Sequence, residues 1–161
     1  MSEARRARIV LINDDTAFLD LMHDLLQSVE GYEVLICKEG DQAHAFVKEA
    51  RPDLVLLDIR IRGEEIGWTV LELLTLDPAT RPIPVIVCSA AIRELQDHEP
   101  LLRRYGVAVL PKPFDLDALL DKVRTGLEQV RRLASPPHEA TSGRTCSSPS
   151  FRTDDTSGPT A

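Results

Sequence analysis

The stretch Leu54-Val55-Leu56-Leu57-Asp58 decides the fold, because four branched aliphatic residues run without a break into a carboxylate. An apolar run of this length is typical of a strand that is covered on both faces, as in the centre of a parallel sheet. Such a strand brings Asp58 to the edge of the sheet where the strands end. Open α/β sheets bind their ligands at that edge. We therefore expect the functional site of this chain around Asp58.

Four further apolar runs repeat the pattern, at residues 9–12, 33–37, 85–88 and 107–110. Each of the five runs is followed by a segment with apolar residues at helical spacing. These segments are residues 16–29, 41–50, 67–76, 91–105 and 116–130. The alternation predicts five βα units, and hence an α/β fold with a doubly wound, five-stranded parallel sheet and helices on both faces.

Two of these predicted helices contain residues that mark where a helix starts or breaks. Asp15 is suited to cap the helix 16–29, whose predicted inward stripe includes Met22, Leu25 and Val29. Pro100 lacks the amide that a continuous helix needs, so we expect the segment 91–105 to be split there.

Length and composition indicate one globular domain. The chain has 161 residues, of which 43% are hydrophobic and 28% charged, and its net charge of -7 argues against direct binding to nucleic acid or anionic membranes. Its three cysteines lack paired spacing, so we expect neither a zinc site nor disulfides, and we expect a cytoplasmic location. The apolar run near the start is too short for a signal sequence or a spanning helix, so no membrane partner is expected.

Composition also suggests three segments: an N-terminal extension at residues 1–7, a domain at residues 8–133, and a tail at residues 134–161. The tail is rich in Pro, Ser and Thr and poor in large apolar residues. Such a segment cannot offset the entropy of ordering, about 1–2 kcal/mol per residue, so we expect disorder and no output domain there.

Polar side chains follow four of the predicted strands. Asn13 and Asp14 come after the first, Asp58 after the third, Ser89 after the fourth and Lys112 after the fifth. Parallel strands bring all of these residues to one edge. Two carboxylates suit Mg²⁺, which keeps several waters in protein sites. A phosphoryl group on Asp58 would then be stabilised by the metal, the lysine and the hydroxyl.

With these residues in place, the chain resembles the receiver domains of two-component response regulators, over about residues 8–133. The matching motifs are Asn13-Asp14, Asp58, Ser89-Ala90 and Lys112-Pro113-Phe114. The resemblance implies a flavodoxin-like (βα)5 fold with strand order 2-1-3-4-5. It also implies a phosphoacceptor that is not an enzyme, beyond self-catalysed phosphorylation and dephosphorylation at Asp58.

The resemblance further implies a ligand set and a switch. Mg²⁺ would be held by Asp14, Asp58 and the backbone carbonyl of Arg60, with Asn13 acting through a water molecule. The Lys112-Pro113 bond would be cis and would aim the lysine into the site. Ser89 would move toward the phosphoryl group.

Partners also follow from the resemblance: a sensor histidine kinase or phosphotransfer protein, and a downstream protein target. A homodimer through the face of the fourth helix, fifth strand and last helix is a further implication.

Three positions depart from the family pattern. Asn13 replaces the first acid of the pair and removes one negative charge from the metal site. The loop after Asp58 lacks the usual proline and Asp-Gly, and Val109 stands where the family often has Tyr or Phe. Because valine cannot swing between two poses as a ring does, we expect activation to change residues 90–105 more than the fifth strand.

Two other function classes remain open on the sequence. One is a receiver-like adaptor that binds partners without phosphorylation, for which Asn13 is the only support. The other is an enzyme on a similar sheet, either an aspartyl-phosphate hydrolase or a flavin protein. The hydrolases carry an Asp-x-Asp motif after the first strand, whereas Asp58-Ile59-Arg60 lacks the second acid, and no Ser/Thr/Gly-rich phosphate loop follows the first strand.

Overall fold

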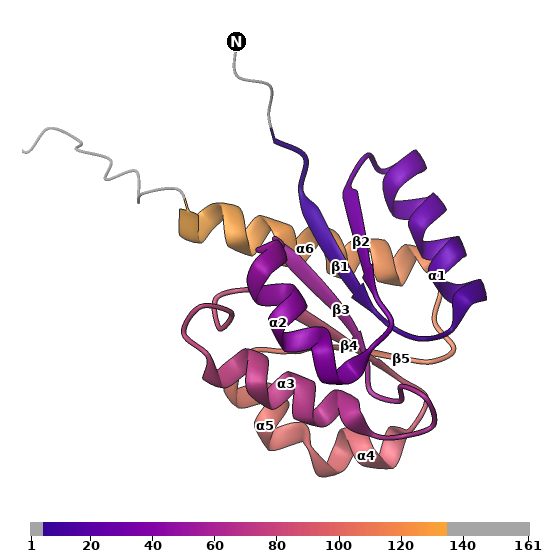
Figure 1. The fold of residues 1–161 in the computed structure, drawn as a ribbon, viewed down its shortest axis with the longest axis vertical. Coiled ribbons are helices and arrows are strands. Elements are labelled where there is room, and N and C mark those ends of the chain that lie inside the picture. Colours follow the sequence, from indigo (N-terminus) through magenta and orange to yellow (C-terminus); the bar gives the residue numbers. More distant parts are fainter. Residues whose placement is uncertain (1–4, 135–161) are drawn as a thin grey trace, which may run out of the picture.

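The computed structural model describes residues 5–134, which form a five-stranded parallel sheet in the order β2-β1-β3-β4-β5 (Figure 1). The strands are β1 (Arg8–Ile12), β2 (Glu33–Cys37), β3 (Leu54–Asp58), β4 (Val85–Ser89) and β5 (Ala108–Pro111). The predicted fold class and strand order are confirmed.

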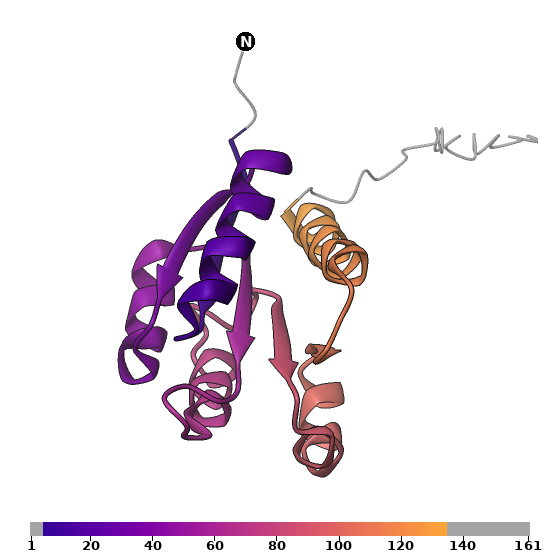
Figure 2. The ribbon, with the colours of Figure 1, turned by 90° about the vertical axis from the view of Figure 1, so that its right-hand side faces the viewer.

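Helices cover both faces of the sheet. They are α1 (Thr16–His23), the π-helix η1 (Asp24–Val29), α2 (Gly40–Ala50), α3 (Ile66–Leu76), α4 (Ile92–Asp97), α5 (Glu99–Arg104) and α6 (Leu116–Ala134). One apolar cluster joins the sheet to α2, α3, α4 and α5, and the other joins it to α1, η1 and α6. Figures 1 and 2 show the helices on either side of the sheet. Successive residues of β3 alternate between these clusters, which explains why this strand is apolar throughout.

Strand register brings the predicted polar residues to one edge. Ile12 lies opposite Leu57, Asp58 opposite Cys88, and Ser89 opposite Pro111. The residues that follow β1, β3, β4 and β5 therefore emerge side by side.

The first helix differs from the prediction of one α-helix over residues 16–29. It continues from His23 as six π-helical residues, in which the Glu30 amide donates to the Leu25 carbonyl at 3.2 Å. The wider π turn changes the angular spacing of the side chains. As a result Val29, predicted to face inward, is 72% exposed, whereas Leu26 is fully buried.

The fourth helical segment is split as expected, but the break falls at His98 and not at Pro100. Pro100 is the second residue of α5, where a helix needs no amide donor. The fifth strand begins one residue later than predicted, because the Val107 amide donates to the Leu102 carbonyl at the end of α5.

The domain ends are partly described. The Ala7 carbonyl accepts the Glu33 amide at 2.9 Å, and α6 continues through Ala134, one residue past the predicted boundary. The rest of the predicted tail, residues 135–161, lies outside the described residues, as do residues 1–4. Among the helices that the structure describes, none has the length and apolar character to cross a membrane.

Candidate functional site

Asp58 lies at the end of β3 and is the centre of the site. Its Oδ2 accepts a hydrogen bond from Lys112 Nζ at 2.9 Å, and its Oδ1 accepts one from the Arg60 amide at 3.1 Å. Only 11% of the Asp58 side chain is exposed. The site therefore pairs one shielded carboxylate with one ammonium group, and such charge-assisted bonds are among the stronger hydrogen bonds in proteins.

Lys112 reaches Asp58 from a strand two positions away in the sheet. Its amide donates to the Ser89 carbonyl at 2.8 Å, which fixes the chain after β5 against the end of β4. The Lys112-Pro113 peptide bond is cis. The ammonium also lies 5.2 Å from the centre of the Phe18 ring, so an aromatic face from α1 supports the lysine.

The loop after Asp58 folds back toward Asp14. Ile61 and Glu64 exchange two backbone hydrogen bonds of 3.0 and 3.1 Å, and the central residues Arg62 and Gly63 both have positive φ, as a type I′ turn requires. The turn directs the Arg62 amide to Asp14 Oδ2 at 2.7 Å. Asp14 is thereby tied to the same loop that begins at Asp58.

The backbone of this loop lies directly on α3. A Cβ atom on Gly67 would be 2.4 Å from Ile59 Cα and 2.6 Å from the Asp58 carbonyl oxygen. Only glycine permits so close an approach. The first turn of α3 therefore fixes the backbone at Asp58.

The remaining polar residues are engaged in local turns. Asn13 is 3% exposed, and its Oδ1 accepts the Asp15 amide at 2.9 Å. Ser89 is 2% exposed, and its Oγ accepts the Ala91 amide at 3.1 Å. Asp15 caps α1 as predicted, with its Oδ1 accepting the amides of Ala17 and Phe18.

The donor set fits Mg²⁺ better than a softer metal. Asp14 and Asp58 supply carboxylate oxygens at adjacent strand ends, and the backbone carbonyl of Arg60 follows two residues after Asp58. Within residues 5–134 there is no cluster of three or more His, Cys, Asp or Glu side chains that would hold a metal. Two carboxylates completed by a carbonyl and waters are typical of magnesium sites.

An ionic cluster that the sequence did not predict connects this loop to α4. Arg60 NH2 lies 3.1 Å from Glu94 Oε1 and 3.9 Å from Glu65 Oε1. A hydrogen bond between the two carboxyl groups raises the pKa of Glu65 and lowers the pKa of Glu94, which Arg60 lowers further. Arg60 and Glu94 are 34 positions apart, and no sequence signal joins them.

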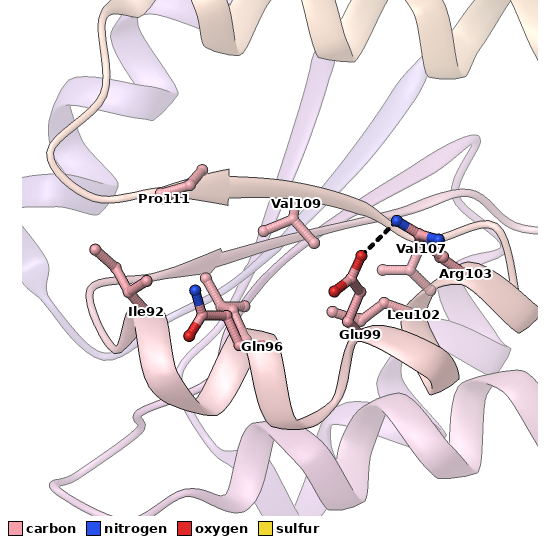
Figure 3. Close-up of a pocket in the computed structure, with 9 residues that line it drawn as sticks. Ile92, Gln96, Glu99, Leu102, Arg103, Val107, Val109 and Pro111 are labelled. Atoms are coloured by element: carbon pink, nitrogen blue, oxygen red, sulfur yellow. Dashed lines mark ion pairs between the residues drawn. The ribbon is translucent and has the colours of Figure 1, made fainter.

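Val109 lies away from Asp58, in a groove of about 450 Å³ between β5 and the helices α4 and α5 (Figure 3). Ile92 and Gln96 come from α4, and Leu102 lies on α5. The Glu99–Arg103 ion pair of 2.6 Å lies at the α5 side of the groove. The walls are mainly apolar, so the groove suits an apolar side chain.

The family model for the response regulator receiver domain matches residues 9–124. This chain belongs to the receiver domain family. The family is a phosphoacceptor signalling module of two-component systems, and both phosphorylation and Mg²⁺ binding are general to it. The resemblance inferred from the strand-end residues is confirmed.

Individual relatives show the same class. The DNA-binding dual master transcriptional regulator RpaA of Synechocystis sp. is 32% identical over 78% of this chain. The response regulator PleD of Caulobacter vibrioides is 34% identical over 74%, and the polar-differentiation response regulator DivK of Brucella anthropi is 29% identical over 74%. The receiver spans 51% of RpaA, 26% of PleD and 94% of DivK.

Solved structures agree on the fold. A CheY-like receiver domain protein from Methanospirillum hungatei has a TM-score of 0.68 and 26% identity, with 80% of this chain and 99% of that chain covered. The receiver domain of the sensor histidine kinase PA1611 from Pseudomonas aeruginosa, described with a magnesium ion in its active site cleft, has a TM-score of 0.64 and 23% identity, with 77% and 99% covered.

Proposed function

We propose that this receiver accepts a phosphoryl group on Asp58 in a Mg²⁺-dependent reaction and passes the signal to a protein partner. One observation carries the proposal: Lys112 Nζ lies 2.9 Å from Asp58 Oδ2, at the edge of the sheet where Asp14 also lies. A shielded carboxylate with an adjacent cation is suited to attack phosphorus and to hold the product.

In the proposed reaction, a carboxylate oxygen of Asp58 forms a bond to phosphorus. The bond from phosphorus to the donor breaks, which is a P–N bond in a phosphohistidine or a P–O bond in a small acyl phosphate. The electron pair of that bond leaves with the donor. Lys112 donates hydrogen bonds to the phosphoryl oxygens, and the hydroxyl of Ser89 is the second donor.

Asp14, Asp58 and the Arg60 carbonyl would hold Mg²⁺, and Asn13 would contact it through a water molecule. The metal, when bound, neutralises the negative charge that develops on the phosphoryl group. Asn13 leaves two carboxylates at the site, which remains within the usual donor set of Mg²⁺. The PA1611 receiver domain, which has the same fold, is described with a magnesium ion in its active site cleft.

The proposed donors are a sensor histidine kinase or a phosphotransfer protein. The proposed target is a protein that binds the surface formed by α4, α5 and β5. The apolar groove at Val109 supports this choice of face, because it offers a concave surface next to the residues that follow Ser89 (Figure 3). Self-association through the same face is the alternative use of the groove.

Phosphorylation by a small donor tests the proposal. The protein is incubated with acetyl phosphate and Mg²⁺, and its intact mass is followed. We expect a gain of one phosphoryl group that is lost with a chelator and absent in Asp58→Asn, which keeps the shape of the side chain. Equal uptake with chelator, or labelling of Asp58→Asn, would show that the site is assigned wrongly.

A second measurement follows the signal. Hydrogen exchange with and without beryllofluoride should change residues 90–105 more than β5, because Val109 has no ring to move. Equal exchange of residues 90–105 in both states would exclude this route.

A further inference from the structure

The Arg60–Glu94 pair joins the proposed metal loop to α4. Arg60 follows Asp58 by two residues, and its amide is bound to Asp58 Oδ1. Glu94 lies in the first turn of α4, three residues after Ala91. Its side chain is only 21% exposed, and its Oε2 is buried. The Glu94 side of the pair is therefore shielded, whereas the Arg60 side chain is 60% exposed.

A second contact holds the other end of α4. The Trp68 ring of α3 stacks on His98 with 3.8 Å between the ring centres and 12° between their planes. His98 Nδ1 donates to the Glu94 carbonyl at 2.8 Å. No side chain caps the start of α4. The buried Leu95, the Arg60–Glu94 pair and the contacts of His98 hold the helix in place.

Ser89 connects this helix to the phosphoryl site. Its Oγ accepts the Ala91 amide at 3.1 Å, immediately before α4 begins. A movement of Ser89 toward a phosphoryl group on Asp58 pulls Ala91 and the first turn of α4 with it. The backbone of Arg60 is held at Asp58. The Arg60–Glu94 pair therefore opposes any displacement of the first turn of α4 away from Arg60.

We propose that Glu94 is a positioning residue, which through the Arg60–Glu94 pair holds α4 in its resting position and opposes the phosphorylated arrangement. This inference rests on the proposed function at Asp58. Because coupling between two sites is reciprocal, weakening the pair must both loosen α4 in the resting protein and strengthen binding of a phosphoryl mimic.

Glu94→Gln tests the inference, with Glu30→Gln as its control. Glu30 pairs with Arg124 at 3.2 Å and is 19% exposed, so the control removes the same charge from a similarly shielded pair. Glu30 lies at the opposite edge of the sheet, where the strands begin. The full-length variants are compared by hydrogen exchange of residues 92–98 without ligand. They are then titrated with beryllofluoride in Mg²⁺, with fluorescence of Trp68, the single tryptophan, as the signal.

We expect Glu94→Gln to raise both the exchange of residues 92–98 and the affinity for beryllofluoride by about two- to fivefold, the range of one partly shielded ion pair. Glu30→Gln should match the wild type in both. A purely structural role of Glu94 would lower stability without raising the affinity. If residues 92–98 exchange at the same rate in Glu94→Gln and in Glu30→Gln, the inference is wrong, regardless of the affinity for beryllofluoride.

Glu65→Gln provides a change of opposite sign. Its amide group can donate to the Glu94 carboxylate, and it no longer competes for Arg60, so the pair should tighten and beryllofluoride should bind more weakly. Stronger binding in this variant overturns the inference. If wild-type protein fails to bind beryllofluoride while Glu94→Gln still loosens residues 92–98, the proposed function is wrong and the holding role of the pair stands.

Discussion

Lys112 places a positive charge where the proposed metal must also act. Its ammonium is 2.9 Å from Asp58 Oδ2, so it competes with Mg²⁺ for that carboxylate and repels the ion. We expect Lys112→Ala to bind Mg²⁺ about two- to tenfold more tightly, and to accept phosphate from acetyl phosphate at least about a hundredfold more slowly, since a donor to the phosphoryl oxygens is lost. Calorimetry and intact mass measure the two effects.

Lys48→Ala is the control for that substitution. Lys48 is exposed and pairs with Asp77, away from the site, so its loss removes the same charge without touching Asp58. It should leave both measurements unchanged. Slower phosphorylation with weaker metal binding in Lys112→Ala would mean that the lysine organises the site in some other way.

Cys88 makes the stability of the fold depend on pH. It lies opposite Asp58 in the sheet, and burial raises the pKa of its thiol to about 12, while Lys112 opposes the rise. In the unfolded chain the Cys88 thiol ionises near its ordinary pKa of about 8.5. Above that pH the unfolded chain therefore binds fewer protons than the folded chain. The free energy of unfolding should therefore fall as pH rises from about 8.5 toward about 12.

Denaturant unfolding between pH 8.5 and 10.5 measures this loss. Comparison with Cys88→Ala isolates it, because every other titrating group is common to both proteins. We expect the wild type to lose up to about 1.4 kcal/mol per pH unit relative to the variant. Parallel pH dependence of the two proteins would show that the folded thiol ionises normally.

At the scale of elements, the contact between α3 and the loop after β3 sets the position of Asp58. Gly67→Ala would place a methyl group 2.4 Å from Ile59 Cα and 2.7 Å from the Ile59 carbonyl oxygen, backbone atoms that cannot move without moving the site. We expect it to lower the free energy of unfolding by at least about 2 kcal/mol and to slow phosphorylation of Asp58. Urea unfolding and intact mass measure these changes.

Gly126→Ala is the matched control in a second helix. A methyl group there would meet the flexible end of the Leu54 side chain at 2.6 Å. That side chain can shift, and alanine favours a helix by about 1 kcal/mol over glycine, so we expect a change below about 1 kcal/mol and normal phosphorylation. An equal effect of both substitutions would exclude the special role of the Gly67 contact.

Most element ends follow from the sequence to within one or two residues, because each apolar run is buried against one or both faces of the sheet. The last helix is the exception, since α6 continues to Ala134, four residues past the predicted 116–130. The π-helix does not follow, since its wider turn depends on how Leu26 packs against the sheet and not on local spacing. The predicted break at Pro100 was wrong, because a proline is accepted in the first turn of a helix and interrupts a helix only beyond that turn. The observed break is at His98.

At the scale of the whole molecule, the parallel sheet explains why the candidate site was predictable. Topology alone places Asp14, Asp58, Ser89 and Lys112 at one edge, whatever the side chains do there. Side-chain partners are different. Two contacts illustrate this: the Arg60–Glu94 pair and the hydrogen bond from the Arg62 amide to Asp14. They depend on the conformation of the loop after β3 and on the position of α4, and the pattern of strands in the sequence predicts neither.

Residues of the described range 5–134 form both apolar clusters. Leu119, Val123 and Leu127 of α6 complete one of them, and Leu95 and Leu102 of α4 and α5 complete the other. Residues 135–161 contain a single aromatic residue, Phe151, and no periodic apolar pattern. We therefore expect deletion of residues 135–161 to change the free energy of unfolding by less than about 0.5 kcal/mol, the scale of ordinary surface changes. Urea unfolding of the full and shortened chains measures this, and a loss above about 1 kcal/mol would show that the deleted segment packs on the domain.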